Sequence, residues 1–304
     1  MINRTYLDRR SFTAGALAAP FVLTTRSVPV LGYSSDRVVS VGGSITETLY
    51  FLNRQELIVG VDTTSIYPRE ALSLPKVGYM RALSAEGILS LNPSMMIAES
   101  DAGPPQAMET LRFAGLDIQL VPDEFSLQGV LEKIRQVGAL VDAADDAESL
   151  IQEVSSRGER ATQSIATLSS RPRVLFVLSL RDGNVMAAGT GTAAEAIIDL
   201  AGGELAFTDY EGYRPVSLEA LHESGPDVIL LMEHVANELG GLDAIKKDGA
   251  LATLDAAQNN RIVSMNGLLL LGFGPRTPDA VMELAGLLHG EGSISDVPEP
   301  LSPA

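Results

Sequence analysis

Two stretches of this chain follow one pattern: KVGYMRALSAEGILSLNPSMMIAE, residues 76–99, and GYRPVSLEALHESGPDVILLME, residues 212–233. Each carries a Gly-Tyr pair and an arginine in a short turn, then a helix-forming segment, a proline and an apolar strand. The matching positions lie 133 residues apart and are Arg81 with Arg214, Ser84 with Ser217, Glu86 with Glu219, and Pro93 with Pro226. A repeated unit of this kind predicts two similar lobes that face each other.

The sequence around these stretches alternates between strand-like and helix-like segments. RVVSVGGSITETLYFLN, residues 37–53, predicts a buried strand, a glycine turn and a helix capped by Ser44. Further apolar strands are separated by helical segments, which is typical of parallel sheets covered by helices. Residues 142–170 contain no strand-like run, and their apolar positions predict one long amphipathic helix. The alternation then restarts.

The predicted fold class is therefore α/β, with two Rossmann-like lobes, central parallel sheets, and one long backbone helix that joins the lobes. The predicted divisions are an export signal at 1–30, an N-terminal lobe at 36–141, an interlobe helix at 142–170, a C-terminal lobe at 171–290 and a disordered tail at 291–304.

Composition excludes several classes of function. The net charge of −17 argues against nucleic-acid binding, because phosphate contacts need clustered lysine and arginine. No apolar run is long enough for a transmembrane helix, so stable membrane insertion is not expected. The chain has no cysteine and three histidines, which excludes thiolate sites and makes a bare divalent-metal cage a poor fit.

The N-terminus predicts export. Arg9 and Arg10 are followed by Ser11, Phe12 and a mild apolar run that reaches Leu23. This pattern is similar to a twin-arginine export signal and predicts a periplasmic protein, with an ordinary basic N-terminus as the alternative.

The order of these segments resembles the periplasmic haem-binding proteins of bacterial ABC importers, which have a helical interlobe backbone. The resemblance covers roughly residues 36–290, and its most specific part is GYMRALSAEG, residues 78–87. It implies that the chain is not an enzyme: it captures haem b, its transported ligand, in a cleft between the lobes and delivers it to permease subunits. No catalytic constellation is expected, and neither is an oligomer.

The resemblance implies that Tyr79 is the axial ligand of ferric haem. Phenolate is a hard anionic oxygen donor, and tyrosine is a known protein ligand of haem iron. Arg81 stands two residues away, so it is expected to favour the phenolate or to pair with a haem propionate. The alternative is an ordinary turn tyrosine beside a solvated arginine.

Four further residues are candidates for haem contact. Tyr213 and Arg214 occupy the equivalent turn of the second lobe. His234 follows a predicted strand at the sheet edge where ligands of α/β folds collect, so it is a possible second iron ligand or hydrogen-bond partner of the phenolate, with an ordinary surface histidine as the alternative. Arg276, in the stretch GFGPR, either faces the cleft or fixes the start of the last helix.

Glu47 and Glu195 each stand near a predicted helix start, one in each lobe. The resemblance implies that such a pair docks onto arginines of the permease, and both are expected to be exposed at the lobe tips. The alternative is that each carboxylate complements its helix dipole.

Two other functions remain open. The same fold could bind a ferric siderophore or cobalamin in place of haem. GTGTAA, residues 189–194, also matches G-x-G-x-x-A, which would suit an exported dinucleotide-dependent oxidoreductase.

Overall fold

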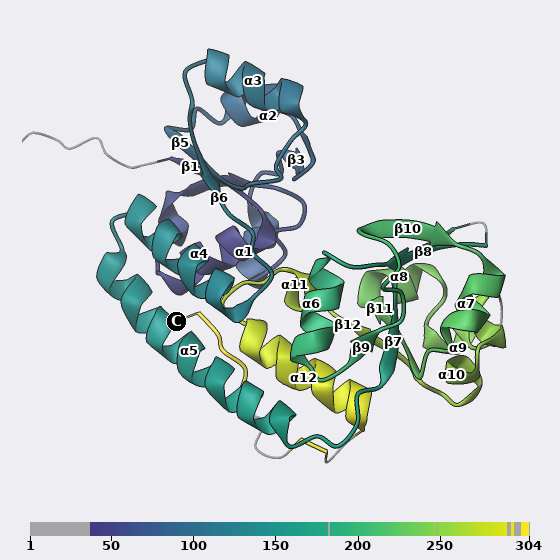
Figure 1. Cartoon of the computed structure of the whole chain (residues 1–304). Helices are drawn as coiled ribbons and strands as arrows, with labels where there is room; N and C mark the ends of the chain where they lie inside the picture. Colours follow the sequence, from purple (N-terminus) through teal and green to yellow (C-terminus); the bar gives the residue numbers. More distant parts are fainter. Residues whose placement is uncertain (1–36, 182, 248, 291–292, 295–298, 304) are drawn as a thin grey trace, which may run out of the picture. The chain divides into compact units, whose positions relative to one another are not determined.

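The N-terminal half is built on a four-stranded parallel sheet in the computed structural model (Figure 1). Its strands lie in the order β2-β1-β5-β6 and are β1 (Val38–Val41), β2 (Ile58–Val61), β5 (Met95–Glu99) and β6 (Asp117–Val121). The inner strand β1 is buried along its whole length, as its apolar run predicts. The structure describes residues 37–181, 183–247, 249–290, 293–294 and 299–303, so the predicted export signal lies outside the described residues.

Helices and short turns complete this half. They are α1 (Gly43–Phe51), η1 (Gln55–Leu57), η2 (Arg69–Ser73), α2 (Ala85–Ser90), α3 (Pro105–Phe113) and α4 (Leu127–Leu140). The cap of α1 differs from the prediction, because Gly42 precedes the helix and Ser44 lies inside it. Gly42 has a φ of 109°, and a Cβ there would lie 2.5 Å from the Glu99 carboxyl carbon. The Ser44 hydroxyl instead donates a hydrogen bond to Glu99 Oε1, at 2.5 Å.

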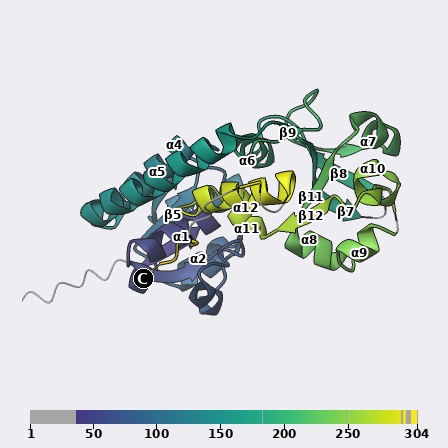
Figure 2. The same cartoon turned by 90° about the horizontal axis from the view of Figure 1, so that it is seen from below.

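A helix of 23 residues, α5 (Ala144–Ala166), follows α4 and confirms the long helix predicted between the two α/β halves. Its buried face carries mostly small side chains, namely Ala147, Ile151, Val154, Gly158 and Ala161. These residues let α5 pack closely against α4 on one side and against α12 (Thr277–His289) on the other (Figures 1 and 2).

The C-terminal half has a mixed sheet in the order β10-β8-β7-β11-β12, with β9 paired to β7. Its strands are β7 (Arg173–Arg181), β8 (Asn184–Ala188), β9 (Glu204–Leu205), β10 (Tyr213–Val216), β11 (Val228–Met232) and β12 (Ile262–Met265). The strands β7, β11 and β12 are parallel, as predicted, whereas β8 and β10 add an antiparallel edge that the sequence pattern did not predict.

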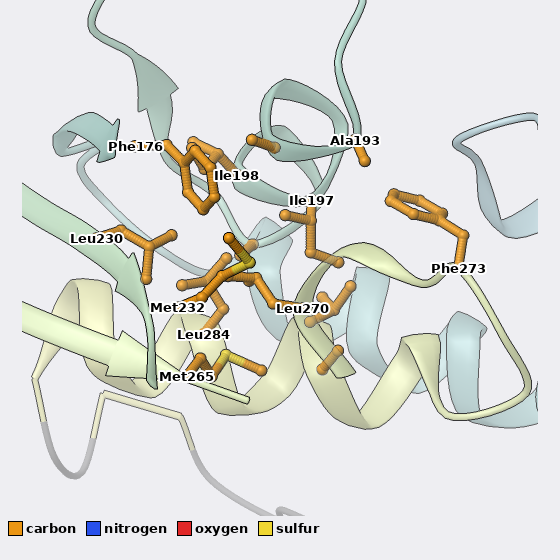
Figure 3. Packing of buried hydrophobic residues seen from close by; sticks show 14 of the residues in the cluster. Phe176, Ala193, Ile197, Ile198, Leu230, Met232, Met265, Leu270, Phe273 and Leu284 are labelled. Atoms are coloured by element: carbon orange, nitrogen blue, oxygen red, sulfur yellow. The ribbon is translucent and has the colours of Figure 1, made fainter. Parts of the chain in front are cut away.

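The helices of this half are short apart from α12. They are α6 (Ala193–Leu200), α7 (Leu218–Ser224), α8 (Glu233–Glu238), α9 (Leu242–Ile245), η3 (Leu251–Thr253), α10 (Asp255–Gln258) and α11 (Gly267–Leu271). Figure 3 shows the core that they share with the sheet: Phe176 and Leu230 of the strands lie toward Ile197 of α6 and Leu284 of α12. Among the described residues, no helix is long and apolar enough to cross a membrane.

The last described residues differ from the predicted disordered tail. Arg157 of α5 donates a hydrogen bond to the Glu299 carbonyl oxygen at 2.7 Å, and the Leu301 N–H donates one to Asp279 of α12 at 2.7 Å. Leu301 also packs against the core. Residues 299–301 therefore contact both long helices, which the polar, proline-rich sequence does not predict.

Candidate functional site

Tyr79 lies on a two-stranded hairpin formed by β3 (Gly78–Tyr79) and β4 (Ala82–Leu83). Met80 and Arg81 make the turn between the strands. Gly78 has a φ of 107°, and a Cβ there would lie 2.6 Å from the Ala82 carbonyl oxygen. Only glycine therefore fits at the start of this hairpin without strain.

Buried side chains and backbone hydrogen bonds hold the hairpin against the edge of the N-terminal sheet. Met80 and Leu83 are buried. The Gly103 N–H donates to the Met80 carbonyl oxygen at 2.9 Å, and the Leu83 N–H donates to the Gly103 carbonyl oxygen at 2.8 Å. Gly103 belongs to the loop that leaves β5, so the hairpin is fixed beside the carboxyl end of that strand.

Tyr79 and Arg81 come together as their spacing predicts. The Tyr79 side chain is 43% exposed, which leaves an aromatic residue open to a ligand. One guanidinium nitrogen of Arg81, Nη1, donates a hydrogen bond to the Tyr79 hydroxyl oxygen at 2.7 Å. The other terminal nitrogen, Nη2, is ion-paired with Asp101. A cation thus lies directly beside the phenol oxygen.

Asp101 is a site residue that the sequence analysis missed. It comes two residues after β5, in the stretch MMIAESDAG, residues 95–103. Polar side chains that follow parallel strands collect at the ligand-binding edge of an α/β sheet. A position just after a strand was the reason for choosing His234, and Asp101 stands at such a position after β5.

Tyr213 begins β10, and its pKa is influenced by residues of the Tyr79 hairpin. Burial raises the pKa of Tyr213, while hydrogen bonds from Thr192 and the Ala194 backbone lower it. The charge of Arg81 also lowers this pKa, and Tyr79 raises it. The two matching turns therefore lie close enough for the side chains of one to act electrostatically on the other.

Arg214 follows Tyr213 and is exposed, with its guanidinium carbon 5.4 Å from the ring centre of Tyr210. Burial raises the pKa of Tyr210 to about 12, and its hydroxyl donates to the Ala187 carbonyl oxygen. Tyr210 is thus a neutral support for the arginine. Within the part of the chain that the structure describes, Arg214 forms no ion pair with a carboxylate.

His234 stands where the sequence predicts, in the first turn of α8 directly after β11, and it is exposed. Its imidazole ring lies beside Gly267, at the start of α11: a Cβ added to that glycine would lie 3.6 Å from Cε1 of His234. No hydrogen bond between His234 and Tyr79 is found among the described residues. Its role as a second iron ligand stays a prediction.

Glu47 is not exposed at a lobe tip, so that expectation is wrong. Its side chain is 4% exposed, and Oε2 lies 2.6 Å from Nη2 of Arg276. The Arg276 backbone N–H also donates to Glu47 Oε1, at 3.2 Å. The Arg276 guanidinium carbon lies 3.4 Å from the ring centre of Tyr67. Arg276 therefore joins the start of α12 to α1. Of the two roles predicted for it, these contacts match the one that fixes the start of the last helix.

Glu195 is half-buried and engaged in its own helix start. Its Oε2 accepts a hydrogen bond from the Gly191 N–H at 2.6 Å, and its N–H donates to Thr192 Oγ1 at 3.1 Å. This arrangement is a variant of the capping box, in which the carboxylate binds the N–H of the residue before the N-cap Thr192. These hydrogen bonds match the alternative in which the Glu195 carboxylate serves the start of its own helix.

A different matched pair has the expected exposure. Glu86 and Glu219 are exposed and stand in the first turns of α2 and α7. Each helix is capped alike, with the Ser84 hydroxyl oxygen accepting from the Gly87 N–H and the Ser217 hydroxyl oxygen accepting from the Ala220 N–H. The 133-residue repeat already aligned these two glutamates.

A buried polar network lies under the same edge of the N-terminal sheet. Lys133 of α4 donates from Nζ to Ser44 Oγ at 2.9 Å and to Asp123 Oδ1 at 2.6 Å. Ser44 in turn donates to Glu99. Burial raises the pKa of Glu99 to about 7, against the opposing charge of Lys133. This network ties α1, α4 and the ends of β5 and β6 together.

Solved structures of similar fold include two haem-binding proteins. The periplasmic heme-binding protein BhuT, in complex with two hemes, is 37% identical to this chain. Its TM-score is 0.79, with 83% of this chain and 97% of that one covered. The periplasmic heme-binding protein RhuT from Roseiflexus sp. RS-1 is 35% identical, with a TM-score of 0.79 and coverage of 84% and 98%.

Curated relatives extend the comparison to other ligands. An uncharacterized ABC transporter substrate-binding lipoprotein, YvrC of Bacillus subtilis, is 26% identical, with 83% of this chain and 80% of the relative covered. The vitamin B12-binding protein of Vibrio parahaemolyticus is 26% identical over 86% of this chain and 90% of the relative. The model of the periplasmic binding protein family matches residues 38–267. With this match and its two-lobed α/β fold, the chain belongs to the periplasmic binding protein family of substrate-binding proteins.

Proposed function

We propose that this protein captures ferric haem between the Tyr79 hairpin and β10 and carries it to a permease. One observation carries the proposal: an exposed tyrosine whose hydroxyl oxygen accepts a hydrogen bond from Arg81 at 2.7 Å. Ferric iron prefers hard anionic oxygen donors, and tyrosine is a known protein ligand of haem iron. The donor set of the site therefore suits haem iron.

The second turn suits the rest of the haem molecule. Haem is a flat apolar macrocycle with two propionates at one edge. Tyr213 offers a half-buried aromatic surface, and the exposed guanidinium of Arg214 is free to bind a carboxylate. The cargo would thus be held by Tyr79 from one lobe and by Tyr213 and Arg214 from the other.

Cobalamin is the second candidate, because a vitamin B12-binding protein is among the relatives. Its cobalt already carries the corrin nitrogens and axial groups of its own, so it has less use for a phenolate beside an arginine. A ferric siderophore likewise brings its own oxygen ligands. The Tyr79–Arg81 pair therefore favours haem over both.

Titration of the purified protein tests the proposal. Addition of ferric haem is expected to give a saturable Soret band with one phenolate-to-iron charge-transfer band. Cyanocobalamin and a ferric siderophore, added in excess, are expected not to displace the haem. Displacement by either, or the absence of saturable haem binding, would overturn the assignment.

The proposal includes delivery to an ABC importer, because proteins of the periplasmic binding protein family serve as the substrate-binding components of such importers. We propose that Glu86 and Glu219, rather than Glu47 and Glu195, contact the permease. The former pair is exposed and symmetrically placed on α2 and α7, whereas Glu47 is buried against Arg276. Two like charges on two similar lobes suit a permease with two-fold symmetry.

Export is proposed to follow the twin-arginine route, on the basis of Arg9 and Arg10. Replacement of both by lysine is expected to leave the precursor in the cytoplasm, as measured by fractionation. Replacement of Arg26, which lies outside the pair, is the matched control.

A further inference from the structure

Arg81 is held from two sides. Nη1 donates to the Tyr79 hydroxyl oxygen at 2.7 Å, and Nη2 is paired with Oδ2 of Asp101. The guanidinium is a planar fork, so fixing one nitrogen directs the other. The Asp101 contact therefore determines where the remaining arm of Arg81 points.

Asp101 is itself fixed by the end of β5. The Ser100 N–H donates to the Val121 carbonyl oxygen at 3.0 Å, and the Ala102 N–H donates to the Glu99 carbonyl oxygen at 3.0 Å. These two bonds bracket Asp101 in the chain. The carboxylate is thus carried by a rigid strand end, while Arg81 stands on the turn of a small hairpin.

The ion pair contributes little to folding. The side chains of Arg81 and Asp101 are 56% and 39% exposed, and exposed pairs add little to stability. A contact of this geometry at the predicted ligand site calls for another purpose. Arg81 has two possible roles at this site: it can donate a hydrogen bond to Tyr79, or it can pair with a haem propionate. The ion pair with Asp101 influences which of the two Arg81 takes.

Asp101 favours the first use. Its carboxylate occupies Nη2 and repels a second carboxylate, so a propionate at Arg81 would meet both a blocked donor and a like charge. Arg214 forms no ion pair with a carboxylate among the described residues. We infer that Asp101 is a positioning residue that commits Arg81 to the Tyr79 oxygen and leaves the haem propionates to Arg214. This inference rests on the proposed haem-binding function.

A double-mutant cycle tests whether Asp101 acts through Arg81. Asp101→Asn is expected to weaken ferric haem binding about tenfold, which corresponds to about 1.4 kcal/mol. It should also shift the charge-transfer band in the same direction as Arg81→Gln. In the Arg81→Gln background, Asp101→Asn should have no further effect. An equal loss in both backgrounds would overturn the inference, and so would an unchanged spectrum for Asp101→Asn alone.

The reduction potential of bound haem separates positioning from simple charge. A hydrogen bond to the phenolate withdraws electron density and stabilises ferrous iron, so Arg81→Gln should lower the potential. If Asp101 positions Arg81, Asp101→Asn should lower it too. If Asp101 acts only through its negative charge, its removal should raise the potential, and the inference fails. Asp101→Glu, which keeps the carboxylate, should restore most of the wild-type value.

Controls keep the inference separate from the proposed function. Asp199→Asn removes another exposed arginine partner, that of Arg171, and should change neither affinity nor potential. Haem dimethyl ester lacks free propionates: Arg214→Gln should lose the preference for haem over the ester, and Arg81→Gln should keep it. The reverse result overturns the inference while haem binding stands. Failure of the wild-type protein to bind haem overturns the proposed function itself.

Discussion

At the scale of single residues, Tyr79 matters most, because it is an exposed aromatic side chain on a rigid hairpin beside a cation. Tyr79→Phe keeps the ring and removes only the oxygen that would bind iron. We expect this change to weaken ferric haem binding about 100-fold, or about 2.7 kcal/mol, and to abolish the charge-transfer band. Tyr50→Phe on α1 is the control and should leave both unchanged. A phenylalanine variant with the wild-type spectrum would contradict the ligand assignment.

Glu99 gives a second prediction, which concerns stability. Its pKa is raised to about 7, so the folded protein keeps a proton on this carboxyl that the unfolded chain has lost above its usual pKa. Stability therefore falls as the pH rises from about 4.5 to about 7, by up to about 3 kcal/mol. Burial is the main cause of the raised pKa of Glu99; Lys133 and the Ser44 hydrogen bond oppose it, and Asp123 and Asp101 add to it.

Glu99→Gln removes this titration while its amide oxygen can still accept from Ser44. We expect the variant to gain stability relative to the wild type between pH 6 and pH 8, as measured by urea unfolding at several pH values. The exposed Glu109→Gln on α3 is the control and should follow the wild-type curve. A wild-type pH dependence in Glu99→Gln would show that another group titrates in this range.

At the scale of elements, the Glu47–Arg276 pair joins α1 to the start of α12. Both side chains are largely buried, so removing one leaves the other charge without its partner. We expect Glu47→Ala to lower the free energy of unfolding by about 3 kcal/mol. Glu148→Ala breaks an exposed pair with Arg135 and should cost less than about 1 kcal/mol. Equal effects of the two changes would contradict the structural role of Glu47.

The element scale also shows what the sequence could and could not predict. Local periodicity predicted β1, α2, β5 and the long helix, because each depends on residues near in the chain. The burial of Glu47 depends on Arg276, which is 229 residues away, and no local pattern reveals such a partner. The antiparallel β8 and β10 escaped prediction because they are short and only partly apolar.

Within the candidate site, too, contacts between residues near in the chain were predictable and contacts between distant residues were not. The proximity of Tyr79 and Arg81 was predictable because only Met80 separates them along one hairpin. Asp101 reaches Arg81 only through the fold, although its place after β5 was a visible signal. Glu86 and Glu219 were already aligned by the repeat, whereas the burial of Glu47 against Arg276 was not visible in the sequence.

At the scale of the whole molecule, two similar halves each present one turn and one capped helix. The turns carry Tyr79 and Tyr213, and the helices α2 and α7 follow them directly in the chain. A protein of this kind needs a ligand site and a surface for its permease on both lobes. In the proposed function the repeat supplies both, because each of the two turns leads straight into a helix whose first turn carries an exposed glutamate.

The docking proposal is tested by reversing that charge. Glu86→Lys together with Glu219→Lys should leave haem affinity in solution unchanged, because among the described residues neither carboxylate forms an ion pair with Arg81 or a hydrogen bond to Tyr79. Haem-stimulated ATP hydrolysis by the reconstituted transporter should fall at least tenfold, with smaller losses for the single variants, since charge pairs mainly set encounter rate and orientation. Added salt should weaken wild-type stimulation in the same direction.

The matched control for this experiment is a reversal at two exposed glutamates away from the helix starts that follow the two turns, Glu109→Lys with Glu159→Lys. It changes the net charge by the same amount and should leave stimulation near the wild-type level. If both double variants reduce ATP hydrolysis equally, the permease responds to overall charge rather than to these positions. If neither does, α2 and α7 do not form the docking surface, and the capped helix starts serve only the fold.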